Sequence, residues 1–519
     1  MDWKKLNPYK NEKGSRDRFY DKTGIAKHRE WRGLEDTWYD FTQWIVNLGI
    51  MGAFVAKSPV RIMRGMLEYR WLGSYLAALH WIDKCMEGVR GPALQVAHTH
   101  MHAIMKASTG HLANMMIGDR RFGDTPNANK QVIFEQTMGP EILAGFPALE
   151  PMSMEAFQGL VGTYMDQHLP VFYLDTMERY GLPADSCRLS ATSTGIAIND
   201  DYPKNGACLI VNNMPCDSST MNSQLIERRF DIPSIVATLP MRWEDEKTDK
   251  YALSQMKKII AFVEKNTGEK FDEAAFIEMM KKHNAEVAAE QEQWDFMKTP
   301  YTPFGLSLAN LFHTVMYAFS GGRLSYIGKA QRKALKIAQR AYEQKISCFP
   351  KTRHRMIHWG GPACFNFHLA NWLYNCWGIL TIAQMDNFEG CVTIDVSSTD
   401  AALLGAAKNY EHGIMRGHLT GGWQHLLEFW ERAEQFNCDM VLMNEDITCK
   451  GGLGLVGVIN DQAKDHPNIH VLTVPNDMFD YRTFTRNDMR QVVNQYMTSV
   501  MQEEPLDATL LDFDDNKGW

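Results

Sequence analysis

Three cysteines share a sequence context that the other seven lack. Cys216, Cys364 and Cys449 each follow an apolar run of strand length and lie in a loop containing Gly, Pro or Asn. In open α/β sheets, ligands collect at the carboxyl ends of the strands, so two facing sheets would bring the three loops together. Three convergent thiolates suit an iron–sulfur cluster with one iron left open, which can bind an oxygen atom as a Lewis acid. The alternative is three half-exposed loop thiols without a ligand.

The spacing of the ten cysteines excludes local metal motifs. No Cys-x-x-Cys occurs, which excludes zinc ribbons and ferredoxin-type runs. The chain starts without the apolar core of a secretory signal. Its most apolar early run, residues 41–55, is interrupted by Gly49 and Gly52 and is too short to span a bilayer. We therefore expect a cytoplasmic protein with reduced thiols and no membrane partner.

His98 and His102 are a second pair of candidate metal ligands. They stand four residues apart, so one face of a helix could present both. No acidic or cysteine ligand is adjacent in the sequence, and we therefore expect core histidines rather than a metal site.

The composition indicates a large folded protein. A length of 519 residues predicts about two to four domains. Hydrophobic residues make up 45% and charged residues 22%, as is usual for globular proteins. The formal net charge of -8 provides no basic field for nucleic acid or anionic lipid, so we expect no nucleic-acid partner.

The pattern of elements predicts an α/β fold in four parts. These parts are a helical N-terminal extension (1–130), a first α/β lobe (131–245), a helical region (246–350) and a second α/β lobe (351–519). Strands are predicted at 207–211, 232–239, 355–359, 379–382, 440–443 and 469–474. Helices are predicted at 63–86, 165–180, 221–230, 248–297 with a break at 268–272, 305–319, 329–345, 367–376 and 485–501. Asp272 is the expected N-cap after the break, and the acidic tail after Glu503 is expected to fray.

Five segments match motifs of one protein family in the same order along the chain. They are Asn212-Asn213-Met214-Pro215-Cys216 (an Asn-Asn-x-Cys loop with one added residue), the strand segment 232–240, Thr267-Gly268-Glu269-Lys270-Phe271-Asp272-Glu273, Gly361-Pro362-Ala363-Cys364 and Asp446-Ile447-Thr448-Cys449-Lys450. On these segments the chain resembles the activator-dependent 2-hydroxyacyl-CoA dehydratase and benzoyl-CoA reductase family, from about Pro140 to Met501. The first 130 residues match nothing in that family.

The resemblance implies a fold, a cofactor and partners. The fold would be two flavodoxin-like parallel-sheet lobes with a helical N-terminal region and a helical linker. Cys216, Cys364 and Cys449 would hold a [4Fe-4S] cluster between the lobes. The chain would pair with a second subunit and receive one electron from a separate ATP-dependent iron–sulfur activator. The sequence has no GxxxxGK[ST] phosphate loop, which agrees with an ATPase on another polypeptide.

The implied activity is a lyase reaction on a 2-hydroxyacyl-CoA. One electron added to the thioester carbonyl would give a ketyl radical, which expels the α-hydroxyl and makes the β-proton acidic. Glu155 is the first candidate to take that proton and Glu150 the second. Lys450 could orient CoA, and Asn212 and Asn213 could donate hydrogen bonds to cluster sulfur, although a solvated loop lysine and ordinary turn residues are the simpler interpretations.

Two other functions stay open from the sequence. The chain could belong to a benzoyl-CoA-type reductase that reduces an aromatic acyl-CoA. It could also be a non-catalytic partner subunit of such a complex. The Trp-, Met- and Tyr-rich N-terminal region could be a partner surface or a lid, or an ordinary core.

Overall fold

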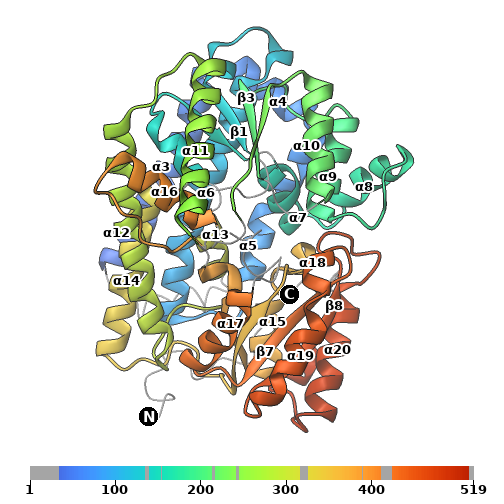
Figure 1. Cartoon of the computed structure of the whole chain (residues 1–519). Coiled ribbons are helices and arrows are strands. Elements are labelled where there is room, and N and C mark those ends of the chain that lie inside the picture. Colours follow the sequence, from blue (N-terminus) through green and yellow to red (C-terminus); the bar gives the residue numbers. More distant parts are fainter. Residues whose placement is uncertain are drawn as a thin grey trace.

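The computed structural model describes residues 34–134, 140–153, 155–212, 217–240, 245–315, 325–388, 390–410 and 423–512. Figure 1 shows a parallel sheet in each half of the molecule, with the long helices α12 and α14 along one side. The predicted class, a mixed α/β protein with two flavodoxin-like lobes and a helical N-terminal region, is confirmed.

Each sheet has four strands, and every pairing is parallel. The first sheet has the order β2-β1-β3-β4 and the second has the order β6-β5-β7-β8. The strands are β1 (Gln131–Phe134), β2 (Glu150–Met152), β3 (Cys208–Asn212), β4 (Ser234–Ala237), β5 (His354–Trp359), β6 (Ile379–Gln384), β7 (Met440–Asp446) and β8 (His470–Asn476). In both sheets the strand order reverses after the first strand, which creates a switch point between β1 and β3 and another between β5 and β7.

The six predicted strands are all present, and β1 and β2 are additional. β1 is a fully buried run of four residues, and β2 has only three, with Pro151 at its centre. Proline is tolerated in β2 because this strand lies at the edge of its sheet. Such short runs carry too little periodicity to be recognised from sequence.

Helices cover both sheets and connect the lobes. In the N-terminal and first-lobe regions they are α3 (Leu34–Lys57), α4 (Pro59–Glu68), α5 (Ala78–Met86), α6 (Gly91–Gly118), α7 (Val161–Met165), α8 (Leu169–Arg179), α9 (Arg188–Ile198) and α10 (Asp217–Phe230). The helices that follow are α11 (Glu246–Thr267), α12 (Glu273–Met297), α13 (Leu306–Thr314), α14 (Ser325–Glu343), α15 (Leu369–Trp377), α16 (Thr399–Asn409), α17 (Trp423–Gln435), α18 (Lys450–Leu453), α19 (Val456–Gln462) and α20 (Arg486–Ser499).

The predicted single helix over 63–86 is wrong. The chain forms α4, then a 3-10 helix over Arg70–Ala77, then α5. The break comes at Tyr69, whose backbone is extended and whose buried hydroxyl donates to Asp119 Oδ2 at 2.5 Å. Trp71 is also fully buried, and its indole N–H donates to the Asp201 carbonyl at 3.1 Å. These two anchors to distant parts of the chain outweigh local helix periodicity.

The break between the two linker helices is where the sequence predicts it. Gly268 ends α11 in the left-handed conformation (φ +76°), which favours glycine. Asp272 caps α12, because its side chain accepts a hydrogen bond from the Ala275 backbone N–H at 2.9 Å. The predicted N-cap is therefore confirmed.

The predicted fraying after Glu503 is wrong for residues up to 512. Leu510 is fully buried against the second lobe. Its carbonyl accepts a hydrogen bond from the Trp372 indole at 2.9 Å. The segment is acidic overall, but the buried side chain of Leu510 fixes it to the second lobe.

Two N-terminal helices stand out by their environment. α6 is 28 residues long and buried for most of its length, in contact with α3, α13 and α14. α3 lies outside it and exposes most of its surface. Within the described residues, no single helix is long and apolar enough to cross a membrane; α3 and α4 meet that criterion only as a pair bent by 101°.

Candidate active site between the lobes

The loops after β5, β7 and β8 are bound to one another at the carboxyl edge of the second sheet. Gly360 has φ +87°, and a Cβ there would lie 2.9 Å from the Asn444 carbonyl oxygen, so only glycine fits. Asn444 donates through Nδ2 to the Gly360 carbonyl at 3.3 Å. Asn476 donates in the same way to the Gly361 carbonyl at 3.1 Å. The three loops therefore form one connected surface at the switch point.

Cys364 begins a short 3-10 turn in the loop after β5 and is 1% exposed. Its backbone N–H donates to the Met478 carbonyl, which belongs to the loop after β8, at 2.7 Å. The Cys364 thiol donates to the Pro362 carbonyl at 3.6 Å. Tyr164, on α7 of the first lobe, lies close enough for its hydroxyl to influence the pKa of this thiol. Both lobes therefore contribute to the surroundings of this thiol.

Cys449 lies in the loop after β7 and caps α18. Its sulfur accepts a hydrogen bond from the Gly452 backbone N–H at 3.4 Å. Its own backbone N–H donates to the Asp446 carbonyl at 3.1 Å. The side chain is half-buried, so Cys449 is the more accessible of the two described thiols.

Asp446 is the common neighbour of both thiols. Its Oδ1 accepts from the Thr448 N–H and hydroxyl, each at 2.9 Å, while its buried Oδ2 has no hydrogen-bond partner among the described residues. Burial raises the pKa of Asp446 to about 6. Burial likewise raises the pKa of Cys364 well above its usual value, and the charge of Asp446 raises it further.

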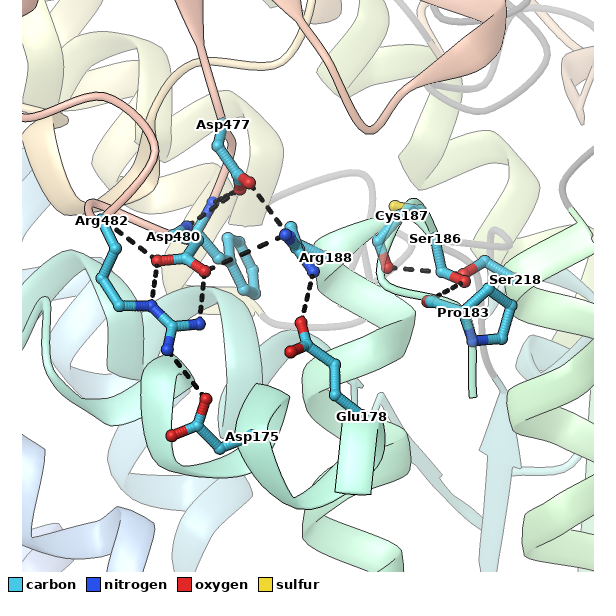
Figure 2. Close-up of polar contacts among 11 residues, drawn as sticks. Asp175, Glu178, Pro183, Ser186, Cys187, Arg188, Ser218, Asp477, Asp480 and Arg482 are labelled. Carbon is cyan, nitrogen blue, oxygen red and sulfur yellow. Dashed lines mark hydrogen bonds and ion pairs between the residues drawn. The ribbon is translucent and has the colours of Figure 1, made fainter. Parts of the chain in front are cut away.

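Arg188 connects the first lobe to the loop after β8. It begins α9, is buried, and donates through Nε to Asp477 Oδ2 at 3.0 Å. Its other guanidinium nitrogens lie 3.9 Å from Asp480 Oδ2 and 3.5 Å from Glu178 Oε1. Figure 2 shows Arg188 between the second-lobe aspartates on one side and Glu178 of α8 on the other.

A second arginine extends this inter-lobe network. Arg482 bonds Asp480 through Nη2 at 2.6 Å and Nε at 2.8 Å. It also reaches Asp175 of α8 at 2.8 Å, as Figure 2 shows. The loop that holds Cys364 through Met478 is thus fixed by two helices of the other lobe.

The two carboxylate candidates have different surroundings. Glu155 is buried, and its Oε1 accepts a hydrogen bond from Ser190 on α9 at 2.7 Å. Ser190 is two residues from Arg188, so Glu155 is linked to the helix that faces the second lobe. Glu150 lies in edge strand β2 and accepts from Asn114 Nδ2 at 2.8 Å.

Cys216 and Asn213 lie outside the described residues. In the sequence they fall between the end of β3 and the start of α10. The structure therefore locates two of the three predicted cysteines, Cys364 and Cys449. Within the ranges described, no three His, Cys, Asp or Glu side chains gather as a metal site.

The other sequence candidates have structural surroundings of their own. His98 and His102 are both buried on α6. His98 Nδ1 lies 3.4 Å and His102 Nε2 3.7 Å from the Asp40 carboxylate of α3, a contact that sequence spacing could not reveal. Lys450 is exposed and pairs with Asp185 at 3.4 Å.

Sequence reasoning missed the residues that come from the first lobe. Tyr164 and Arg188 reach the site from helices that carry no recognisable motif. Asp446 and Asp477 had a weak signal, because both lie where a strand ends and a loop begins.

These features define a two-lobed α/β protein whose candidate site lies at a switch point between the lobes. Residues 155–497, about two thirds of the chain, match the family model described as 2-hydroxyglutaryl-CoA dehydratase, D-component. The chain therefore belongs to this family, that of the activator-dependent 2-hydroxyacyl-CoA dehydratases, and the resemblance is confirmed. A comparison with curated proteins finds no match.

The family match fixes the general type of this chain. It is a component of the dehydratase type, a class of lyase. The match includes all three predicted cysteines and Glu155. It does not include residues 34–134, so α3 to α6 lie outside it.

Proposed function

We propose that this chain is the iron–sulfur subunit of a 2-hydroxyacyl-CoA dehydratase. Cys216, Cys364 and Cys449 would hold a [4Fe-4S] cluster. The observation that supports this most is the position of Cys364 and Cys449. They follow neighbouring strands β5 and β7 at the switch point, and both adjoin Asp446.

The surroundings of these thiols fit such a group. Cysteine sulfur is the ligand that iron–sulfur clusters use. Cys364 is buried within reach of the charge of Asp446, whose Oδ2 has no hydrogen-bond partner among the described residues, so bound iron would meet negative charge and little water. When bound, the cluster would supply one-electron chemistry and an open iron as a Lewis acid.

First-lobe residues would shape the space next to the cysteines. Tyr164 is buried next to Cys364, where its hydroxyl influences the pKa of the thiol. Glu155 would take the β-proton of the substrate, and the Ser190 hydroxyl fixes the orientation of its carboxylate. Arg188 would act only as a positioning residue, because its contacts are to carboxylates of the loop after β8.

Two protein partners follow from this proposal. The electron would come from a separate ATP-dependent iron–sulfur activator, since the sequence contains no GxxxxGK[ST] phosphate loop. A second subunit would complete the enzyme, as membership in the family implies.

A product assay tests the proposed reaction. The complete enzyme, with its partner subunit and activator, is incubated without oxygen with a 2-hydroxyacyl-CoA, beginning with 2-hydroxyglutaryl-CoA. We expect an enoyl-CoA and many turnovers for each electron supplied. Formation of a cyclic dienoyl-CoA from an aromatic acyl-CoA, with electrons consumed in proportion, would assign the chain to a reductase instead.

A further inference from the structure

A single turn of π-helix, Ala156–Leu160, directly follows Glu155 and continues into α7. Wide turns of this kind are rare and occur frequently at functional sites. Glu155 is buried and has helical backbone angles (φ -56°, ψ -41°), so its backbone is continuous with the π turn. The contacts that hold this turn therefore also fix the direction of the Glu155 side chain.

The backbone of the π turn is held by the N-terminal region. The carbonyl of Phe157 accepts a hydrogen bond at 2.5 Å from the hydroxyl of Tyr75, in the 3-10 helix over Arg70–Ala77. The preceding residue, Ser74, donates to Asp166 Oδ2 at 3.1 Å, and Asp166 directly follows α7. Two adjacent residues of the N-terminal region thus hold the segment after Glu155 at both of its ends.

The side chains of the π turn pack against α6, which is also part of the N-terminal region. His111 of α6 stacks on the ring of Phe157 with 3.8 Å between ring centroids and 20° between ring planes. Burial lowers the pKa of His111 to about 3, so the imidazole is neutral and packs as an uncharged ring. One turn further along α6, Met115 Sδ accepts from Gln158 Nε2 at 3.9 Å.

Another side of the π turn faces the candidate site. A Cβ added at Gly159 would lie 3.4 Å from Phe479 and 3.8 Å from Thr192 of α9. Phe479 belongs to the loop after β8, and its backbone N–H donates to Asp477 Oδ1 at 3.1 Å. The turn that follows Glu155 therefore lies between the N-terminal region and the elements that join the two lobes.

We infer that Tyr75 and His111 are positioning residues for Glu155, and that the N-terminal region thereby forms part of the active site. This inference rests on the proposed role of Glu155 as proton acceptor. Both residues precede the family match, which begins at residue 155 and assigns them no role. A displacement of about 1 Å at a reacting group costs roughly 10²-fold in rate, so contacts that do not touch the carboxylate can still govern turnover.

The test compares turnover by the complete enzyme, with its partner subunit and activator, for Tyr75→Phe and His111→Ala. We expect kcat to fall by about 10- to 10²-fold and KM to change by less than about twofold, because the carboxylate is misplaced while the substrate still binds. In a Glu155→Gln background the same substitutions should lower kcat no further, since they act only through Glu155. A purely structural role would lower kcat equally in both backgrounds.

Each variant has a matched control. His100→Ala removes another buried, neutral histidine of α6, which stacks on Phe312 of α13 with 4.0 Å between ring centroids. Tyr374→Phe removes a buried tyrosine hydroxyl of the second lobe, which accepts from the Lys351 backbone N–H at 3.1 Å. Both controls should keep kcat within about twofold of the wild-type value, because neither residue contacts the π turn.

Hydrogen exchange of the purified chain tests the contacts without turnover. We expect the backbone amides of residues 156–165 to exchange about 2- to 10-fold faster in Tyr75→Phe and His111→Ala than in the wild type. The two controls should leave exchange in this segment at the wild-type rate.

The inference and the proposed function fail in different ways. Wild-type exchange in both variants would overturn the inference. Wild-type kcat in both variants, or equal losses with and without Glu155→Gln, would also overturn it where Glu155→Gln itself is impaired. A wild-type enzyme without turnover, or an unimpaired Glu155→Gln variant, would instead contradict the proposed function, and the inference that rests on it would fall with it.

Discussion

Asp446 interacts with both of the described cysteines, Cys364 and Cys449. Its carbonyl holds the Cys449 backbone and its buried carboxylate acts on the Cys364 thiol. The sequence shows only that an aspartate stands three residues before Cys449, and it predicts neither contact. The cysteines themselves could be predicted because each follows a strand, and strand ends are where parallel sheets bind ligands.

At the residue scale, the role of Glu155 can be tested with Glu155→Gln. Glutamine keeps an oxygen that can accept the Ser190 hydrogen bond but cannot take a proton. We expect turnover of the complete enzyme to fall by about 10²- to 10⁴-fold, with iron content unchanged. Glu150→Gln is the control and should retain activity. Equal activity in Glu155→Gln and the wild type would remove Glu155 from the mechanism.

His354 gives a prediction about pH. Its Nδ1 lies 2.8 Å from Asp439 and its Nε2 2.8 Å from Glu503. The hydrogen bond to Asp439, supported by the one to Glu503, raises the pKa of His354 above its usual 6.5 in spite of burial. A raised pKa in the folded state means that the charged form stabilises the fold.

The stability difference between wild type and His354→Gln should therefore depend on pH. It should be largest below the ordinary histidine pKa of about 6.5, where His354 is charged in both states. It should shrink as pH rises through the higher pKa of the folded state. Urea denaturation of both proteins from about pH 5.5 to about pH 9 measures this difference. A difference that is constant or grows with pH would contradict the assignment.

At the scale of elements, α8 and α9 depend on a close approach at Gly195. A Cβ at Gly195 would overlap the Tyr173 carbonyl oxygen, and a backbone atom cannot turn aside as a side chain can. Gly195→Ala should therefore push the two helices apart and lower the free energy of unfolding by about 1–3 kcal/mol. Gly110→Ala, in open space on α6, should be neutral or stabilising by up to about 1 kcal/mol. Urea denaturation would contradict this account if Gly195→Ala matched the wild type.

Which elements could be predicted follows from how local their causes are. β5 and β7 read as apolar runs of strand length, and α12 has its cap, Asp272, in the adjacent sequence. The prediction of one helix over 63–86 was wrong because Tyr69 and Trp71 form hydrogen bonds with Asp119 and Asp201, which lie far along the chain. Tertiary contacts of this kind are invisible to periodicity.

At the scale of the whole molecule, buried ion pairs hold the lobes together around the site. Arg188 is 8% exposed at its side chain and Asp477 is fully buried. Arg188→Met would leave Asp477 buried without its partner, so we expect a loss of about 3–5 kcal/mol in the free energy of unfolding. Lys450→Met breaks the exposed pair with Asp185 and should cost less than about 1 kcal/mol. Similar losses from the two substitutions in urea denaturation would show that the Arg188 pair does not join the lobes.

The site as a whole was only half predictable for the same physical reason. The second-lobe loops that carry Cys364 and Cys449 could be predicted because each follows an apolar strand. The first-lobe contributions from Tyr164 and Arg188 arise because folding places α7 and α9 against those loops. The outward apolar face of α3 was read only as a general surplus of Trp, Met and Tyr, because the sequence does not show which side of a helix is buried.

The most direct test of the central claim is the iron and acid-labile sulfide content of the chain, purified without oxygen. We predict about four of each per chain, as one [4Fe-4S] cluster requires. Serine at Cys216, Cys364 or Cys449 should abolish this content. Cys438→Ser, at the opposite end of β7 from Cys449, should keep it. Near-zero iron after anaerobic reconstitution, or full iron in the three serine variants, would contradict the proposed cluster and the function built on it.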